Sequence, residues 1–426
     1  MVKNTATYDE TFQSKADHLL RLFPPLGGTE VMELKTGRGP IPKITAEFWG
    51  PGQRNGHSLH EISYRACYKS ELPALFIEAL TQPGDWVYDP FGGRGTTALE
   101  AALRGRNAAS NDINPLSGML LRPRLAPPSL EAIADRLEQI PRISKKAKTP
   151  DLSMFFHAET ESEIRALRDW FRSRQKSGRF DEVDDWIRMV SLNRLTGHSA
   201  GFFSVYTLPP NQAMPAKKQA EINLIRKQVP PYRDTHALIL KKSKALLKNF
   251  TRSEDLASLR SIGEFASLHC GSADRTPDIP DGKIDLVVTS PPFLDVVQYH
   301  LDNWMRNWFA DIDEKSVESS FIYERTIEGW SRRIERAFQE VHRVMKPGGW
   351  FVMEVGEIKK ASIHMEDLLW PIGESTGLNL QGVLIHAQSF TKTAHIWGVG
   401  NNQSGTNSHR MVLFRKQSIE VPGNRI

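Results

Sequence analysis

Short apolar runs alternate with helix-forming segments in two separate parts of the chain. In the first part, residues 86–88 form an apolar run, a glycine turn follows at 92–95, and residues 96–103 have helix-forming composition. In the second part, residues 266–274 and 283–293 are predicted strands, and the latter is continuously apolar, as in a central parallel strand covered on both faces. The alternation predicts an α/β fold with helices on both faces of a sheet.

The sequence on either side of these two parts adds further elements. Residues 332–357 predict a helix, a Pro-Gly-Gly stop and another strand. Residues 382–416 predict two more strands around the loop GNNQSGTN. Residues 1–50 are rich in glycine and proline near 24–28 and 37–42, which predicts a loosely organised arm that leads into the folded body.

The alternation stops between residues 115 and 262. Residues 129–140 and 159–173 are predicted amphipathic helices, because each has Ser or Thr near its start and apolar positions three and four residues apart. We therefore expect a largely helical insertion that divides the α/β core. The predicted regions are an N-terminal arm at 1–56, a first core part at 57–125, the insertion at 126–263 and a second core part at 264–426.

Composition limits the class of protein. The chain has 426 residues, 39% of them hydrophobic, so it can bury a large core. Its first residues lack the apolar core of a signal peptide and no long uncharged apolar stretch could span a bilayer, so we expect a soluble, cytoplasmic protein. Cys67 and Cys270 lie far apart and outside any Cys-x-x-Cys pair, which indicates buried thiols and neither a disulfide framework nor a metal site.

Positive charge is concentrated between residues 215 and 250. The whole chain has 55 Lys and Arg against 50 Asp and Glu, which is compatible with a polyanionic partner without requiring one. This stretch contains only two acidic residues, Glu221 and Asp234. It contains nine basic residues, at positions 217, 218, 226, 227, 233, 241, 242, 244 and 248. The stretch is a candidate phosphate-contacting surface, and a solvated helix face explains it equally well.

The densest chemical signal lies at 84–115, GDWVYDPFGGRGTTALEAALRGRNAASNDINP, a strand, glycine turn and helix of the kind that opens a nucleotide-binding unit. Asp112 follows Asp89 by 23 positions, close to the spacing of about 20 residues at which such folds place an acid on ribose hydroxyls. The glycines let a ligand approach the backbone, and the helix N-terminus favours a carboxylate. A glycine turn after a strand occurs in every α/β fold, so this segment alone does not identify a ligand.

A Ser-Pro-Pro-Phe corner ends the second apolar strand, in the stretch VVTSPPF at 287–293. Ligands of parallel sheets bind at the carboxyl ends of the strands. We therefore expect Ser290 and Asp274 on the same rim as the 91–97 turn. The corner taken alone is also compatible with an ordinary strand-ending turn.

Aromatic and amide side chains occur together inside the insertion, in RLTGHSAGFFSVYTLPPNQAM at 194–214. Phe202, Phe203 and Tyr206 could line a nucleic-acid groove, and Asn211 and Gln212 offer amide groups suited to base edges. A packed strand and turn is the simpler interpretation of the three aromatic residues.

These motifs together resemble one family. The stretches DPFGGRGTT (89–97), GSAD (271–274), TSPPF (289–293) and KPGGWF (346–351), with the Asp112 position, are similar to the S-adenosylmethionine-dependent amino-methyltransferases of DNA, which methylate cytosine N4 or adenine N6. The resemblance covers roughly 57–125 and 264–416. It implies a Rossmann-like methyltransferase sheet, interrupted by the insertion, with S-adenosyl-L-methionine as cofactor and double-stranded DNA as substrate.

The resemblance assigns the chemistry to Ser290, Pro291, Pro292 and Phe293. An exocyclic amine is a poor nucleophile because its lone pair is delocalised into the ring. The Ser290 side chain and the carbonyl of Pro291 are suited to accept its two N–H bonds, and the prolines restrict the backbone. Phe293 would stack on a base swung out of the duplex.

The same resemblance places the cofactor. The methionine part would lie at the first-core turn, the ribose at Asp112 and the adenine near Asp274. Residues 57–80 look like the helix that precedes the first strand in this family and closes the methionine pocket, with Tyr64 as a contact. The complete set of expected cofactor-binding residues is Tyr64, Asp89, Phe91, Gly92, Gly93, Gly95, Thr96, Asp112 and Asp274.

Ser at position 290 resembles the cytosine-N4 members, since Asp is usual in the adenine-N6 members; adenine-N6 methylation of DNA and methylation of an RNA amino group are the alternatives. The order of motifs is similar to members that keep target recognition in the insertion, so we expect recognition at 126–263. The first 50 residues and the loop 294–330, with Tyr299, Trp304, Arg306 and Trp308, are alternatives. A restriction-modification context, with a cognate restriction endonuclease as partner, is also implied by the resemblance.

Other classes of protein fit the residues less well. A cytosine-C5 methyltransferase needs a nucleophilic thiol, commonly after proline, and neither cysteine has that neighbour. An RNA methyltransferase would usually carry a recognisable RNA-binding module. A DNA-binding protein with a decayed methyltransferase fold is the third alternative, against which the intact residues at every chemical position argue.

Overall fold

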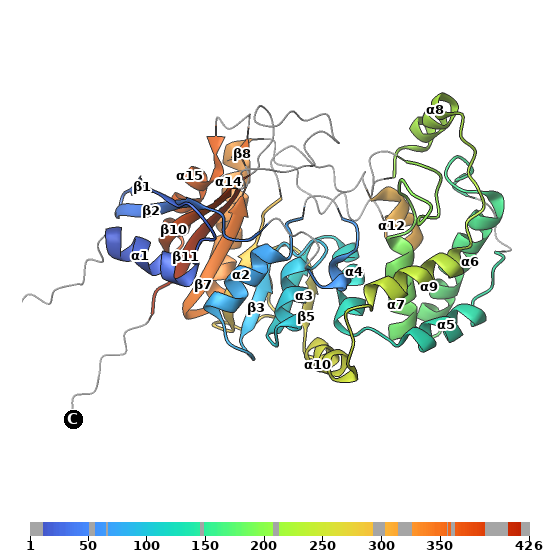
Figure 1. The fold of residues 1–426 in the computed structure, drawn as a ribbon, viewed down its shortest axis with the longest axis horizontal. Coiled ribbons are helices and arrows are strands. Elements are labelled where there is room, and N and C mark those ends of the chain that lie inside the picture. The colour runs from blue at the N-terminus through green and yellow to red at the C-terminus, as the bar shows by residue number, and fades with distance from the viewer. Residues whose placement is uncertain are drawn as a thin grey trace, which may run out of the picture.

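The computed structural model places an α/β lobe beside a helical lobe (Figure 1). It describes residues 12–50, 56–64, 67–144, 149–207, 213–292, 303–313, 326–355, 357–358, 363–387 and 408–418. Among the helices that these residues form, none combines the length and the apolar character needed to cross a membrane. The same residues contain no group of three or more His, Cys, Asp or Glu placed to hold a metal ion.

A nine-stranded sheet forms the centre of the α/β lobe, in the order β1-β2-β10-β11-β7-β6-β3-β4-β5. Strands β5, β4, β3, β6 and β7 are parallel to one another, and β11 is antiparallel to both β7 and β10. A short antiparallel pair, β8–β9, stands apart from this sheet. The strands are β1 (Glu30–Thr36), β2 (Gly39–Ala46), β3 (Trp86–Asp89), β4 (Asn107–Asp112), β5 (Ser267–Cys270), β6 (Ile284–Thr289), β7 (Met345–Val355), β8 (Glu357–Ile358), β9 (Ile363–His364), β10 (Leu378–Ala387) and β11 (Ser408–Lys416).

Alternate residues of the central strands pack against helices on the two faces of the sheet. Val87 and Leu286 belong to one buried cluster, and the adjacent Tyr88 and Val287 belong to the other. Helices α2 (Glu71–Leu80), α3 (Thr96–Leu103) and α4 (Pro115–Leu125) contribute to the first cluster, and α14 (Ile327–Val344) and α15 (Met365–Ser375) to the second. The Rossmann-like sheet with helices on both faces is therefore confirmed.

The predicted insertion is largely helical, as expected. Its helices are α5 (Leu130–Gln139), α6 (Ala158–Lys176), α7 (Glu182–Leu192), α8 (Ala216–Arg226), α9 (Thr235–Leu246) and α10 (Ser253–Glu264). Helices α5 to α9 form the helical lobe together with α12 (Trp304–Ala310), which comes from beyond β6 and packs on α7 (Figure 1). Helix α10 instead packs on α3 and α4, as part of the layer that covers the sheet.

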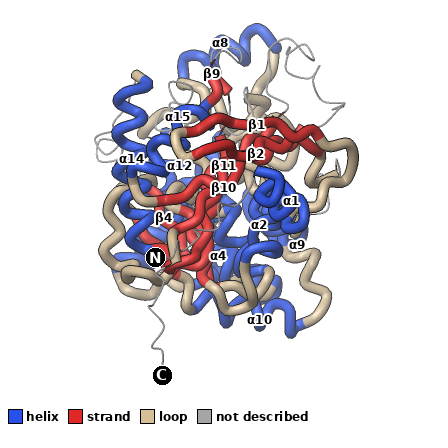
Figure 2. Tube along the Cα trace, turned by 90° about the vertical axis from the view of Figure 1, so that its left-hand side faces the viewer, coloured by secondary structure: helices blue, strands red, loops and turns tan. Residues whose placement is uncertain are grey.

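The expectation that residues 1–50 form a loosely organised arm is wrong for the residues that the structure describes from 12 onward. Helix α1 (Phe12–Leu22) buries Ala16 and Leu19, and β1 and β2 pair as an antiparallel hairpin. Strand β2 also pairs in parallel with β10, so the hairpin extends the central sheet (Figure 2). The physical reason is that β2 supplies backbone hydrogen bonds to β10, and its residues Ile41 and Ile44 are buried in the core.

The expected helix over 57–80 is also only partly right. A single helical turn forms at Ser58–His60 and α2 begins at Glu71, and the backbone at 61–64 and 67–69 is irregular. In that irregular part the Arg94 guanidinium donates hydrogen bonds to the carbonyls of Ile62 and Tyr68, at 3.0 and 3.3 Å. Because a side chain satisfies these carbonyls, the segment wraps around the glycine turn without being helical. The expectation of buried thiols fails for Cys270, which is exposed.

Candidate functional site

A tight glycine turn connects β3 to α3 and lies against β4. Gly95 has φ +79°, a left-handed conformation that favours glycine, and it precedes the first residue of α3. The Gly92 N–H donates to the Asn111 carbonyl at 2.8 Å. A Cβ atom at Gly92 would lie 2.2 Å from the Ser110 Oγ, so only glycine lets the turn approach β4 this closely.

Asp112, at the end of β4, holds the turn from the other side. Its carboxylate accepts hydrogen bonds from the backbone N–H groups of Gly93 and Asn114, both at 2.8 Å. Burial among protein atoms raises the pKa of Asp112 to about 6, although part of the residue stays accessible. A carboxylate has about four lone-pair positions, so Asp112 can accept further hydrogen bonds from a ligand.

Asp89, at the end of β3, joins the turn to the Ser-Pro-Pro corner. It is 1% exposed, and its carboxylate accepts hydrogen bonds from Thr289 Oγ1 at 2.5 Å and Tyr68 Oη at 2.9 Å. The Phe91 N–H donates to the same carboxylate at 3.0 Å. Burial raises the pKa of Asp89 to about 6. Thr289 directly precedes Ser290, so Asp89 fixes the carboxyl end of β6 relative to the turn.

The Ser-Pro-Pro corner begins where β6 ends. Ser290 is partly exposed, and within the described part of the chain its hydroxyl has no hydrogen-bond partner. Pro291 is buried and Pro292 is exposed. The Pro292 carbonyl accepts a hydrogen bond from Trp330 Nε1 of α14 at 3.1 Å, which fixes the direction of that peptide group. Phe293 lies outside the described residues.

Trp330→Phe tests whether this tether positions the corner. The ring keeps most of the apolar packing of Trp330, which is 5% exposed, but the donor to Pro292 is lost. For the activity and cofactor that the sequence resemblance implies, we expect turnover in a methyl-transfer assay to fall by about tenfold, the effect of one hydrogen bond, while the dissociation constant of S-adenosyl-L-methionine stays unchanged. A loss of cofactor affinity with unchanged turnover would contradict a positioning role.

Tyr64 lies beside the glycine turn, as expected of a cofactor contact. Its Cε1 atom is 3.8 Å from the position that a Cβ atom would take at Gly93. Arg94 anchors the segment that carries Tyr64, and its Nε also donates to Thr96 Oγ1 at 3.1 Å. Thr96 is 3% exposed, and the N-terminus of α3 has no side-chain cap.

Asp274 occupies the loop after β5 on the far side of β4. Its carboxylate accepts a hydrogen bond from Arg336 Nε at 3.2 Å. Burial alone would raise the pKa of Asp274, but hydrogen bonds from Ser272 and Arg336 lower it below its usual value. The loop is tied to β4 because Asn111 Nδ2 donates to the Gly271 carbonyl at 3.0 Å. A contact of Asp274 with an adenine ring stays a prediction.

Most predicted site residues thus come together at the carboxyl ends of the strands. Tyr64, the glycine turn and Asp112 form one group, and Asp89 connects that group to Ser290 through Thr289. Sequence reasoning missed Tyr68, Thr289 and Trp330. Thr289 carried a signal, since it belongs to the motif TSPPF, but Trp330 lies 38 positions from its partner Pro292 and no spacing pointed to it.

The aromatic stretch of the insertion is mostly core. Phe203 is fully buried and Phe202 is 7% exposed beneath the Arg194 guanidinium, so the packed alternative holds for both. Tyr206 is partly exposed, with the Arg226 guanidinium 3.8 Å from its ring centroid. Asn211 and Gln212 lie outside the described residues.

The residues of the loop 294–330 that the structure describes are held by the helical lobe. Trp304 Nε1 donates to the Ala213 carbonyl at 2.9 Å, and Arg306 donates to the carbonyls of Leu192 and Ser63 at 3.3 and 3.0 Å. Trp308 lies beneath the Arg165 and Arg168 guanidinium groups. These contacts give the three side chains structural roles. Tyr299 lies outside the described residues.

The basic stretch at 215–250 divides into two kinds of residue. Lys242 is half-buried next to Glu61, at 3.7 Å, and burial lowers its pKa to about 8. Arg233 is also only partly accessible, and Lys248 pairs with Glu61 at 2.6 Å. The exposed basic residues of the stretch are Lys217, Lys218, Arg226, Lys227, Lys241, Lys244 and Lys248.

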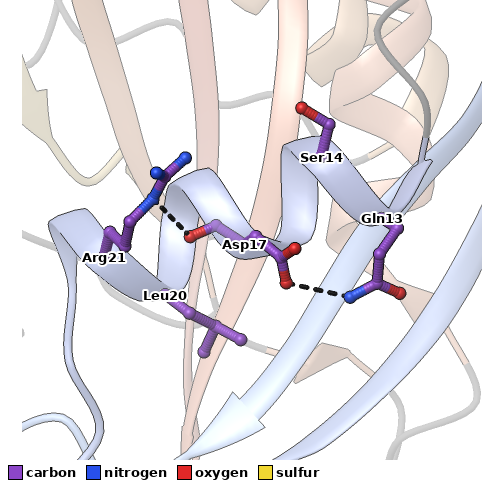
Figure 3. Close-up of a pocket in the computed structure, with 5 residues that line it drawn as sticks. All are labelled: Gln13, Ser14, Asp17, Leu20 and Arg21. Atoms are coloured by element: carbon purple, nitrogen blue, oxygen red, sulfur yellow. Dashed lines mark hydrogen bonds between the residues drawn. The ribbon is translucent and has the colours of Figure 1, made fainter.

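A surface hollow along α1 lies outside this site. Figure 3 shows that its lining comes from one helix, with Gln13 donating to the Asp17 carboxylate at 2.9 Å. Arg21 Nε donates to the Asp17 carbonyl at 3.3 Å. The hollow brings together none of the predicted site residues.

Comparison with known proteins gives the family. A family model described as DNA methylase, of the N6/N4 methyltransferases, matches residues 29–116 and 284–421, just over half of the chain. The chain therefore belongs to the N6/N4 DNA methylase family, whose cofactor is S-adenosyl-L-methionine.

Individual relatives are more distant. The chain is 26% identical to the Type II methyltransferase M.BsoBI of Geobacillus stearothermophilus in an alignment 286 residues long, which covers 61% of this chain and 54% of that protein. The chain thus spans about half the length of this curated relative. A putative DNA modification methylase of Thermus thermophilus is 20% identical over 37% of this chain and 53% of its own, with TM-score 0.22. A TehB-like methyltransferase of Corynebacterium glutamicum is 11% identical over 81% and 87%, with TM-score 0.28.

The residues at the site fit S-adenosyl-L-methionine. Glycine at position 92 lets the turn pack on β4, and a Cβ atom at Gly93 would lie 3.8 Å from Tyr64 Cε1, so glycine there keeps the space between the turn and Tyr64 open. The uncapped N-terminus of α3 offers N–H groups to a carboxylate, and Asp112 keeps acceptor capacity for ribose hydroxyls. Asp89 accepts three hydrogen bonds from the protein itself and is 1% exposed, and its contact with the cofactor stays a prediction.

Cofactor affinity is expected to depend on the ionisation of Asp112. Because its pKa is raised to about 6, the carboxylate is protonated as pH falls through that value and loses acceptor strength for the ribose hydroxyls. We expect the dissociation constant of S-adenosyl-L-methionine, measured by calorimetry, to rise by up to about tenfold per pH unit below pH 6. Asp89 titrates in the same range, so Asp112→Asn separates the two: it should bind weakly at pH 8 and lose this dependence. A parent-like pH profile in Asp112→Asn would remove Asp112 from the ribose.

Proposed function

We propose that the chain is a site-specific DNA methyltransferase that transfers a methyl group from S-adenosyl-L-methionine to the exocyclic N4 amine of cytosine in double-stranded DNA. The observation that carries the proposal is the Ser290 hydroxyl, without a hydrogen-bond partner in the described part of the chain. It stands at the carboxyl end of β6, which Asp89 links to the glycine turn. The DNA methylase family match supports the same reaction class.

The corner activates the amine by accepting its N–H bonds. Hydrogen bonds from the two N–H groups to Ser290 Oγ and to the Pro291 carbonyl turn the nitrogen lone pair out of conjugation. The two prolines hold the acceptors in place, and Trp330 fixes the following carbonyl at 3.1 Å. When bound, S-adenosyl-L-methionine would supply a methyl group on a positively charged sulfur; uptake of that group by the oriented amine would break the carbon–sulfur bond, release S-adenosylhomocysteine and free one N–H proton to solvent.

Two buried hydrogen bonds fix the position of the glycine turn relative to the Ser-Pro-Pro corner. Thr97 Oγ1 donates to the Val288 carbonyl at 3.1 Å, so the first turn of α3 is joined to β6 directly. Thr289 joins β6 to Asp89 of β3 at 2.5 Å. Both bonds run between the cofactor turn and the corner. They support a reaction that depends on alignment of two ligands.

The base must leave the duplex to reach this corner. Its exocyclic amine is inaccessible within the stack, so the enzyme would extrude the target nucleotide. In this proposal Phe293 stacks on the extruded ring. Ser at position 290 favours cytosine over adenine, because a hydroxyl stands where Asp is usual for adenine N6.

Target recognition is proposed for the region 126–263, most of which forms the helical lobe. The lobe stands beside the sheet (Figure 1), and Arg306 ties it to Ser63, next to the predicted cofactor contact Tyr64. A restriction-modification role, with an endonuclease that reads the same site, is part of the same proposal.

Transfer of labelled methyl groups tests the substrate class. Purified protein is incubated with S-adenosyl-L-methionine labelled on the methyl group and either duplex DNA of mixed sequence or RNA, and incorporation into polymer is counted. We expect incorporation into duplex DNA that ceases when the competing product S-adenosylhomocysteine is in excess. Incorporation into RNA alone would move the function to an RNA methyltransferase, and cofactor binding without incorporation would contradict both.

A further inference from the structure

Helix α8 is attached to the helical lobe through its polar side. Gln219 is the buried residue of this helix, and its Nε2 donates to the Tyr206 carbonyl at 3.1 Å. Asn223 Nδ2 donates to the Met154 carbonyl at 2.7 Å, and Gln228 Nε2 donates to the Tyr206 carbonyl at 3.0 Å. Side-chain amides therefore occupy the positions where a surface helix ordinarily places apolar residues.

The apolar residues of the same segment face outward. Leu224, Ile225 and Val229 are 80%, 82% and 83% exposed. We call these three residues the α8 ridge. Single exposed apolar residues are normal on a protein surface, but three large aliphatic side chains within six positions form a patch that indicates a partner.

The surroundings of the ridge are positively charged. Lys217, Lys218, Arg226 and Lys227 are exposed on or just after α8, and Glu221 is the acidic residue among them, paired with Lys218 at 3.2 Å. A second copy of the chain would bring these like charges together. A polyanion with apolar surface between its charges matches the patch, and duplex DNA has this character in its phosphates and the edges and faces of its bases.

Helix α8 lies at the end of the molecule at which the parallel strands β6 and β7 end. Figures 1 and 2 both place α8 at the top, the end at which the β8–β9 pair also lies. Strand β8 begins two residues after the carboxyl end of β7, and β7 runs parallel to β6, which ends at the Ser-Pro-Pro corner. DNA laid across this end of the molecule would meet both the corner and α8.

We propose that α8 is a DNA-contacting element, in which Leu224 and Ile225 pack against base or sugar surfaces of the duplex beside the target nucleotide while the flanking cations contact phosphates. The proposal rests on the proposed function. Aliphatic side chains wedged into a duplex stabilise a deformed helix, and extrusion of a base requires such a deformation. The outward direction of Leu224 and Ile225 on α8 would place both side chains against the duplex.

Leu224→Gln with Ile225→Gln tests the ridge. Both side chains are exposed, so the substitutions leave the core intact, and the matched control is Leu26→Gln with Phe265→Gln, whose side chains are 65% and 70% exposed elsewhere. The dissociation constant for fluorescent duplex DNA is measured by anisotropy with S-adenosylhomocysteine present. We expect binding about tenfold to a hundredfold weaker in the ridge variant, and unchanged in the control.

A second variant, Lys217→Gln with Lys227→Gln, tests the flanking cations. The slope of the logarithm of the DNA-binding constant against the logarithm of salt concentration should become shallower by about 0.9 per lost phosphate contact.

The outcomes separate the ridge from the proposed reaction. Weaker DNA binding in the ridge variant supports the inference even if the parent chain transfers no methyl group, which would overturn the proposed function alone. Parent-like DNA binding in the ridge variant overturns the inference, whether or not methyl transfer is found. A parent chain that binds no duplex DNA, or a dimer in sedimentation that the ridge variant loses while DNA binding is unchanged, also overturns it.

Discussion

Replacing Ser290 by alanine is expected to lower the turnover of methyl transfer by about a hundredfold to a thousandfold, the effect of losing one preorganised hydrogen-bonding group at a reacting centre. We expect the dissociation constant of S-adenosyl-L-methionine to stay within about twofold of the parent value, because in the proposed function Ser290 acts on the amine and not on the cofactor. Single-turnover kinetics with duplex DNA measure the first quantity, and calorimetry measures the second.

Ser290→Ala removes the hydroxyl without breaking a hydrogen bond within the described part of the chain. In the described residues its hydroxyl holds no other group, so its removal leaves no buried donor or acceptor unpaired. Ser261→Ala is a matched control, since this exposed serine of α10 donates to the Ser258 carbonyl at 2.8 Å, away from the strand ends. Parent-like turnover in Ser290→Ala would end the assignment of Ser290 as an acceptor for the amine.

Gly95→Ala is expected to destabilise the fold. The residue has φ +79°, a left-handed conformation that costs a residue with a Cβ atom about 1–2 kcal/mol. The added Cβ would also lie 2.7 to 2.9 Å from side-chain atoms of Leu121, and such overpacking costs about 1–3 kcal/mol. We expect the free energy of unfolding, measured in urea, to fall by about 2–5 kcal/mol.

Gly118→Ala is the matched control for this prediction. Gly118 lies within α4 and a Cβ atom there would meet nothing within 4 Å. Alanine at this helical position should leave the free energy of unfolding unchanged or raise it by up to about 1 kcal/mol. In a Leu121→Ala background, which is itself destabilised because Leu121 is 1% exposed, adding Gly95→Ala should cost only the conformational part, about 1–2 kcal/mol. Equal stability of Gly95→Ala and the parent would show that the turn does not have the described conformation.

Local motifs made the centre of the site predictable. The glycine turn consists of consecutive residues. Its partner Asp112 follows Asp89 at the spacing that a strand-turn-helix-strand unit imposes. Ser290 follows an apolar strand that the sequence marks as central. These positions are fixed by short-range geometry, so the fold around them leaves little freedom.

The hydrogen bonds that connect the motifs to one another could not be predicted from local sequence. Tyr68 reaches Asp89, and Trp330 reaches the Pro292 carbonyl, across separations that carry no periodic pattern. The β1–β2 hairpin was missed for a related reason: Val31 and Met32 of the edge strand β1 are 40% and 42% exposed, and proline and glycine near the turn resemble a loop.

Helix α8 illustrates a further limit of sequence patterns. Its lysines were noted as a charge run, but the run said nothing about which side faces the protein. The answer depends on Gln219 and Asn223, which bind backbone carbonyls of other segments. Only the folded chain reveals that the aliphatic residues of this helix face outward.

The identity of the methylated nucleoside tests the account most directly. The purified protein is incubated with duplex DNA of mixed sequence and S-adenosyl-L-methionine, the DNA is digested to nucleosides, and the products are separated and weighed by mass spectrometry. N4-methylcytosine is the predicted product. N6-methyladenine would retain the role of the corner but contradict the inference drawn from Ser290, and an absence of any methylated base in DNA would contradict the proposed function itself.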